Sequence, residues 1–134
     1  MAYRQPVINL TQGDTLPPIR LVVYDSAHPA SGKTINPNDP DTWSRIDLRR
    51  VDHVVLLFKP TQAFQDPIEI PCHIENSAHG EISVLWGDTD LMFEGSFVGK
   101  VRLYYKEIDP ETDRSRTLKW TSKVEIPFEI EPLF

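Results

Sequence analysis

Residues 97–130 read FVGKVRLYYKEIDPETDRSRTLKWTSKVEIPFEI. Apolar and polar residues alternate on both sides of a polar, proline-containing segment at residues 108–115, and a period of two is typical of half-buried strands. We therefore predict a long antiparallel hairpin, with a second arm that runs without a break over residues 118–130. Ser122 is the only polar residue expected on the inner face of that arm. The inward-facing residues expected in the core are Phe97, Val101, Leu103, Tyr105, Leu118, Trp120, Val124, Ile126, Phe128 and Ile130.

The rest of the chain also has strand patterns. Residues 54–58 are apolar on both faces, which predicts a covered central strand. Residues 68–74 alternate, and Pro71 indicates an edge strand or a bulge. Further strands are expected at residues 7–10, 19–24 and 82–86, with Trp86 at the centre of the core. About seven to eight short strands predict an all-β fold, an immunoglobulin-like antiparallel β-sandwich.

The length and charge limit the classes of function. The 134 residues suit a single domain over residues 1–134, and 12 prolines argue against a helical bundle. A net charge of -6 makes a nucleic-acid partner unexpected, because phosphate binding needs clustered cations. The sequence has neither a signal-peptide pattern nor an apolar run of membrane-spanning length, so synthesis in the cytoplasm and no membrane partner are expected.

No residue pattern indicates catalysis or a cofactor. The single cysteine, Cys72, lies among inward-facing residues and is expected to be core filler. The four histidines lack the spacing of a zinc site. Two oxygen-rich clusters, at residues 36–41 and 109–113, lack the glycine of a calcium loop. We therefore expect a protein that is not an enzyme and holds no cofactor.

Residues 26–44 have no periodicity and contain three prolines, and we expect them to form a long inserted loop with a functional role. Of the large aromatic residues, Trp43 in this loop and Tyr104 on the hairpin are the two expected to be exposed. They are candidates for a sugar-binding platform.

Three stretches resemble a known family. They are the Gly13-Asp14-Thr15 opening, the segment 46–54 with Asp47, and the segment 80–101 with Trp86, Gly95 and Gly99. Together they resemble the immunoglobulin-like domain at the N-terminus of bacteriophage baseplate upper proteins and of related tail adaptors. The resemblance extends from residue 7 to residue 130. The sequence departs from the pattern at Arg49, where Ser or Thr is usual, at Phe97, which replaces Tyr, and in the tighter spacing from Trp86 to Asp88.

The resemblance implies a virion structural protein made in the cytoplasm of a bacterial host. It would be a stand-alone tail or baseplate adaptor that docks one virion protein to another, in several copies. Two alternatives are a capsid decoration protein and a carbohydrate-binding module. The tail at residues 131–134 could insert into a neighbour or seal its own domain. The residues expected to dock a partner are Tyr3, Val7, Ile8, Trp43, Leu133 and Phe134.

Overall fold

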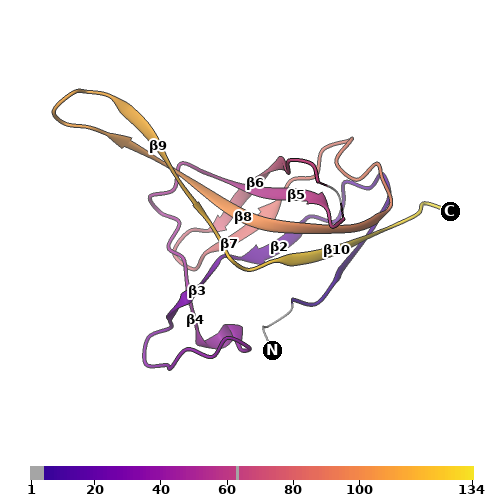
Figure 1. Ribbon diagram of the computed structural model, residues 1–134, viewed down its shortest axis with the longest axis horizontal. Helices are drawn as coiled ribbons and strands as arrows, with labels where there is room; N and C mark the ends of the chain where they lie inside the picture. The colour runs from indigo at the N-terminus through magenta and orange to yellow at the C-terminus, as the bar shows by residue number, and fades with distance from the viewer. Residues whose placement is uncertain (1–4, 63) are drawn as a thin grey trace.

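The computed structural model describes residues 5–62 and 64–134, and this part of the chain is all-β, as predicted (Figure 1). A single 3-10 turn at Pro40–Thr42 is its one helical element. The strands are β1 Ile8–Thr11, β2 Ile19–Val22, β3 Tyr24–Pro29, β4 Trp43–Arg45, β5 His53–Pro60, β6 Ile68–Asn76, β7 Glu81–Val84, β8 Gly95–Ile108, β9 Ser115–Thr121 and β10 Ile126–Glu131.

One sheet contains eight of these strands. Its order is β1-β10-β8-β5-β6-β7-β2, and β9 pairs with the C-terminal half of β8, residues 102–108. The sheet curls around one core like half a barrel, which gives a sandwich-like architecture (Figure 1). The pairs are antiparallel except β1 with β10, which is parallel, so the sheet is mixed. β3 and β4 form a separate two-stranded sheet.

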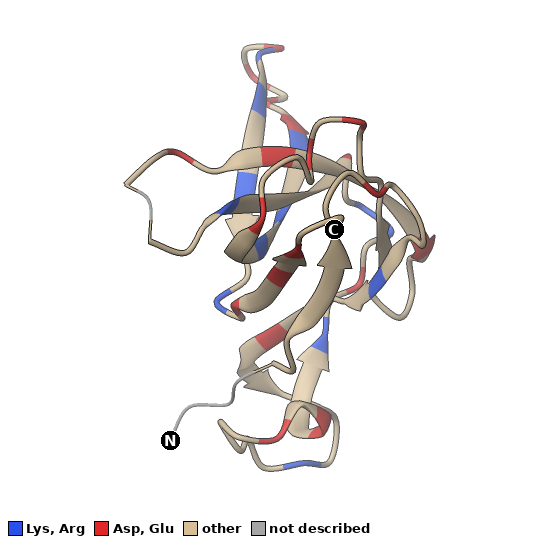
Figure 2. Ribbon diagram, turned by 90° about the vertical axis from the view of Figure 1, so that its right-hand side faces the viewer, with Lys and Arg blue, Asp and Glu red and all other residues tan. Residues whose placement is uncertain are grey.

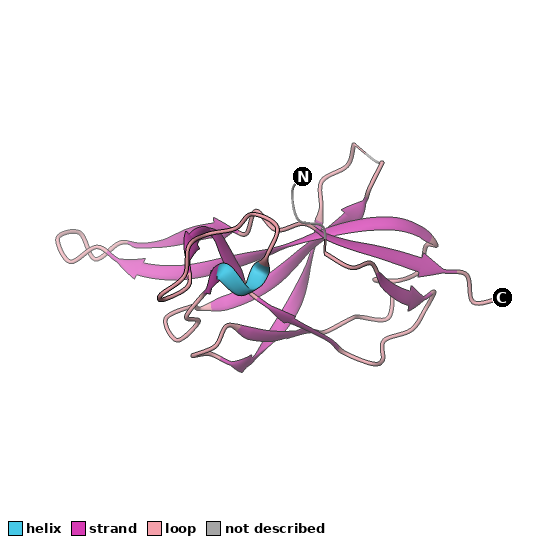
Figure 3. Ribbon diagram, turned by 90° about the horizontal axis from the view of Figure 1, so that it is seen from below, coloured by secondary structure: helices cyan, strands magenta, loops and turns pink. Residues whose placement is uncertain are grey.

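The predicted hairpin is present, but its second arm is broken. β8 pairs with β9 over residues 102–108 and with β10 over residues 95–99. Between the two strands, Ser122 is buried, and its hydroxyl donates to the Tyr24 carbonyl and accepts from the Val124 amide. The prediction of one continuous strand is therefore wrong. The Ser122 amide still donates to the Val101 carbonyl, but its hydroxyl bonds to the backbone of Val124 and of the distant Tyr24, and pairing with β8 resumes only at Ile126. The β8–β9 hairpin projects as an arm at the end opposite the C-terminus (Figure 3).

The core lies on the concave face of the sheet. Seven predicted core residues are buried there, and Tyr105 and Trp120 are half-buried against them. Val124 is half-buried and lies outside the main cluster, and Leu118 is exposed because the arm carries it beyond the body. The seven confirmed residues are Trp86, Phe97, Val101, Leu103, Ile126, Phe128 and Ile130.

Aromatic rings fill the middle of this core. Phe58 of β5 stacks on Phe97 with ring centroids 4.8 Å apart, and it meets Trp86 and Phe128 edge-on. Gly99 faces the same cluster, and a Cβ there would lie 2.9 Å from the Leu56 side chain and 3.0 Å from Phe128. The close neighbours of Gly99 therefore come from β5 and β10.

Pro71 lies inside the sheet, which corrects the prediction of an edge strand. β6 is flanked by β5 and β7, and Pro71 pairs with Val55. The Pro71 carbonyl accepts from the Leu85 amide, just beyond the end of β7 at Val84. In an antiparallel pair, the nitrogen and the carbonyl of one residue face the same neighbouring strand, so the Pro71 nitrogen also faces this end of β7. The missing N–H of the proline therefore removes no bond of the β6–β7 ladder. The bulge in β6 lies further along, between Ile74 and Asn76.

Residues 26–44 are only partly irregular, since residues 26–29 lie in β3, residues 40–44 lie in the 3-10 turn and β4, and residues 30–39 form a loop between them. They belong to a lobe formed by β3, the 3-10 turn and β4, which leaves the curled sheet at its lower left in Figure 1. Trp43 is only 5% exposed, packs edge-on against Tyr24, and donates its indole N–H to the Asn36 carbonyl at 2.9 Å. Thr42 and Asp39 close the turn with further hydrogen bonds. The expected exposure of Trp43 is wrong because the lobe folds around this ring.

Candidate docking surfaces

The C-terminus emerges at one end of the sheet (Figures 1 and 3), and several loops at this end carry exposed apolar side chains. This end carries the loops β1–β2, β5–β6 and β7–β8 together with residues 132–134. Soluble monomeric proteins rarely expose large contiguous apolar patches, so these exposed apolar side chains at one end of the sheet indicate a contact surface. In these loops, in the tail and at the start of β6, the exposed large apolar residues are Leu16, Phe64, Ile68, Leu85, Met92, Phe93, Leu133 and Phe134.

Gln12 holds two of these segments together. Its side-chain amide donates to the Met92 carbonyl at 2.6 Å, and its side-chain oxygen accepts from the Leu133 amide at 3.4 Å. Its backbone amide donates to the Glu131 carbonyl, and the next residue, Gly13, donates to Leu91. The C-terminal segment and the β7–β8 loop are therefore neighbours fixed to the same short stretch.

The predicted docking residues are only partly brought together. Leu133 and Phe134 are exposed, at 58% and 108%, so the tail does not seal the sheet. Val7 is 52% exposed, whereas Ile8 pairs in register with Phe128 and packs on the core. Trp43 lies in the separate lobe, and Tyr3 falls outside the described residues.

Sequence reasoning missed Phe93, Glu94 and Ile68, which line an open groove at the same end. Residues 88–94 form a turn-rich loop between β7 and β8. A signal was available in this segment. Leu91, Met92 and Phe93 are three consecutive apolar residues in an otherwise acidic stretch outside any strand, and only Leu91 is buried.

Tyr104 points outward from β8, as its position in the alternation predicts, yet it is only 7% exposed. His53 stacks on its ring at 4.4 Å, and its hydroxyl donates to the Glu69 carboxylate. Lys119 lies over the ring, 5.8 Å from its centroid. The expected exposure of this aromatic is therefore wrong, and Tyr104 has no open face for a sugar ring.

Charged pairs surround this tyrosine. Asp52 contacts the His53 ring at 2.7 Å and the Lys106 ammonium at 3.3 Å, and these partners lower the pKa of its carboxyl group. On the far side of the loop, the Arg49 guanidinium hydrogen-bonds Asp47 and lowers the pKa of that carboxyl group to about 2. These groups are paired with one another, so they fix the loop that enters β5.

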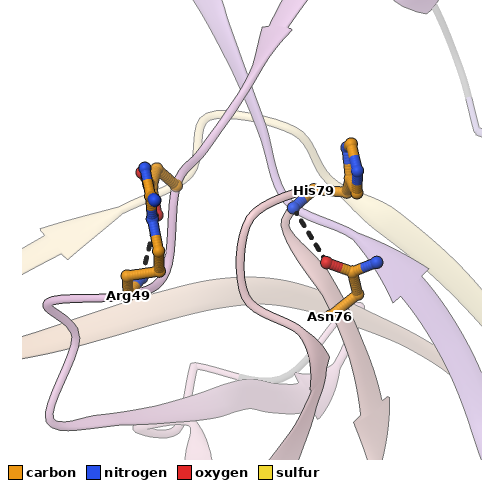
Figure 4. A network of polar contacts seen from close by, with 4 residues as sticks. Arg49, Asn76 and His79 are labelled. Carbon is orange, nitrogen blue, oxygen red and sulfur yellow. Dashed lines mark hydrogen bonds and ion pairs between the residues drawn. The ribbon is translucent and has the colours of Figure 1, made fainter.

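The loop with Asp47 rests on the turn between β6 and β7. The Leu48 amide donates to the Ser77 carbonyl at 2.8 Å, and the two loops run side by side in Figure 4. Within the second loop, the His79 amide donates to the Asn76 side chain (Figure 4). These hydrogen bonds hold the loop at residues 46–52 against the β6–β7 turn.

The residues considered for chemistry are dispersed. In the described part of the chain, no group of three or more His, Cys, Asp or Glu side chains could hold a metal ion. Burial raises the pKa of the Cys72 thiol to about 12, which keeps it protonated and unreactive at neutral pH. No helix among the described residues is long and apolar enough to cross a membrane.

Comparison of the chain with protein-family models, with curated proteins and with solved structures finds no match. The resemblance to phage baseplate domains therefore rests on the sequence motifs quoted above, and the docking surfaces rest on the geometry.

Proposed function

We propose that this protein is a non-enzymatic structural protein of a bacteriophage virion, an adaptor in the tail or baseplate that docks one virion protein to another. Two lines support the proposal. The motif resemblance suggests the phage context, and the surface suggests docking. Several copies would assemble around the symmetry axis of the tail, after synthesis in the cytoplasm of the host.

The observation that carries the docking role is the set of exposed apolar side chains at the C-terminal end. Met92 and Phe93 are 50% and 74% exposed, and Leu133 and Phe134 are 58% and 108% exposed. Burying one such side chain contributes roughly 1.5–3 kcal/mol. A partner that covers these four residues would therefore gain a large part of the binding energy that a specific complex needs.

The β8–β9 arm offers a second contact at the opposite end of the molecule (Figure 3). Among the described strands, β9 pairs with β8 alone, and Ile108 near the tip is 67% exposed. An isolated two-stranded hairpin is marginally stable in water, so a partner that covers it would stabilise it. An adaptor needs two separated contact regions, and this chain offers them.

The test begins with purified particles of the phage that encodes the chain. We expect the protein in the particle in a fixed copy number, and a reconstruction of the particle should place it in the tail. Leu133→Ser with Phe134→Ser should lower incorporation at least tenfold while the isolated protein keeps its melting temperature. Absence from particles despite soluble expression would refute the proposal, and density on the head would replace the tail adaptor with a capsid decoration protein.

A further inference from the structure

An open groove of about 990 Å³ lies at the end of the curled sheet where the C-terminus emerges, between the β5–β6 loop and the β7–β8 loop. The stacked rings of Phe58 and Phe97 contribute to its apolar lining from within the core. Ile68, which is 47% exposed, and Phe93, which is 74% exposed, add apolar surface that solvent reaches. An open, partly apolar groove of this size is large enough for several residues of a peptide.

The polar lining of the groove is acidic. Glu69, Asp90 and Glu94 contribute carboxylates, and none of the lining residues is Lys, Arg or His. Asp88 lies in the same loop as Glu94. Figure 2 looks onto this end and shows acidic segments in several of the loops around the C-terminus.

Cations within the chain do not neutralise these carboxylates. Glu69 accepts from the Tyr104 hydroxyl and Asp90 accepts from the Gly87 amide, and both donors are uncharged. Among the described residues, Glu94 has no hydrogen bond or ion pair. The negative charge of the groove is therefore available to an incoming cation.

We propose that this groove binds an extended segment of another protein in which apolar side chains alternate with Lys or Arg. The inference rests on the proposed docking function and names the chemistry of the partner. The apolar side chains would cover Phe93 and Ile68, and the cations would pair with Glu94 and its acidic neighbours. Electrostatic complementarity of this kind fixes the orientation of the partner and speeds association.

A second copy of this chain does not match the groove. The exposed apolar tail at residues 131–134 carries Glu131, and the tip of the β8–β9 arm carries Asp109, Glu111 and Asp113. Both segments would bring negative charge to an acidic groove. The cations of β9 are already engaged within the chain, since Arg116 pairs with Glu107 at 2.7 Å and Lys119 lies over the Tyr104 ring. The complementary occupant is therefore a cationic, apolar segment of a different protein.

Randomised eight-residue peptides in a display library test the inference, with the intact protein as the immobilised target. We expect enrichment of peptides that combine Lys or Arg with aromatic or aliphatic residues. The most enriched peptide, synthesised with a fluorophore, should bind with micromolar affinity in a polarisation assay. Phe93→Ala should weaken its binding at least tenfold, since truncation of a central aromatic contact commonly has an effect of that size.

Glu94→Lys should weaken the same peptide about tenfold at low salt, and the effect should shrink in ~0.5 M NaCl, where exposed charges are screened. Two matched variants on the β8–β9 arm control for lost apolar surface and for changed net charge. Ile108→Ala and Glu111→Lys should leave the affinity unchanged within twofold. Each of the four variants is checked by its melting temperature, and the exposure of the four side chains predicts that all remain folded.

Three outcomes would overturn the inference: no enrichment, enrichment of acidic peptides, or equal binding by Phe93→Ala and wild type. Self-association of the purified protein that Phe93→Ala abolishes would assign the groove to a second copy instead. The docking function is tested separately in particles. If the chain is incorporated and binds no cationic peptide, the groove inference fails alone; if it binds the peptide and is absent from particles, the virion assignment fails alone.

Discussion

Gly99→Ala gives a quantitative test of the packing. Gly99 lies in β8 and faces the core, where an added Cβ would lie 2.9 Å from Leu56 Cδ1 and 3.0 Å from Phe128 Cε2. Both neighbours are at most 1% exposed and cannot turn into solvent. Overpacking of this kind costs about 1–3 kcal/mol, and replacing glycine in a strand returns about 0.5–1 kcal/mol. We expect the free energy of unfolding to fall by about 1–2 kcal/mol.

Urea denaturation measures this loss. With a urea dependence of about 1–3 kcal/mol/M for a protein of this size, the midpoint should fall by roughly 0.5–1 M at an unchanged slope. Leu56→Val removes part of the clash, so Gly99→Ala should cost about 1 kcal/mol less in that background. Ile82→Val, three strands away in β7, is the matched background in which the cost should not change. An unchanged or raised midpoint for Gly99→Ala would refute the packing described here.

Three further predictions concern single residues. Gly80→Ala should destabilise the fold by at least 1–2 kcal/mol in urea denaturation, because Gly80 has a φ of +69° and a Cβ there would lie 2.7 Å from the Ile46 carbonyl oxygen; an unchanged midpoint would contradict this. An NMR titration should give the Asp47 carboxyl group a pKa of about 2, and Arg49→Gln should return that pKa toward 3.8. Because the folded-state pKa is lowered, the contribution of the Asp47–Arg49 pair to the free energy of unfolding is complete above pH 3.8 and is lost as the pH falls through about 2. The Cys72 thiol should react with a disulfide reagent at pH 8 about a thousandfold more slowly in the native protein than in denaturant, as follows from a pKa of about 12 against 9.0; equal rates would show that the thiol is not buried.

Local alternation in the sequence predicts much of the sheet. Residues 54–58 and 97–103 alternate or are apolar throughout, and they form the two central strands, β5 and β8, with the expected sides facing inward. Side-chain alternation fixes the face of a strand residue because successive Cβ atoms point to opposite sides. The two central strands, the β8–β9 hairpin and most of the core could therefore be predicted from the sequence alone.

What alternation does not predict is the contribution of distant segments. Tyr104 points to the expected face, but His53 from a neighbouring strand covers it. Trp43 lies in a segment without periodicity, and the lobe that buries it is built from turn hydrogen bonds of Asn36 and Thr42. Ser122 continues the inward-facing pattern, yet its hydroxyl bonds to a residue 98 positions away. In each case the deciding partner is set by tertiary contacts.

The candidate docking end follows from the way the sheet curls. β1 and β2 are the two end strands, and the short segment between them crosses the mouth of the sheet. Gln12 and Gly13 in that segment bond to Glu131, to Leu91 and to Met92. The loops that carry the exposed apolar residues are thereby held by backbone hydrogen bonds before any partner arrives. A contact surface fixed in advance loses less conformational entropy on binding, so even the modest set of apolar side chains at this end can support a specific complex.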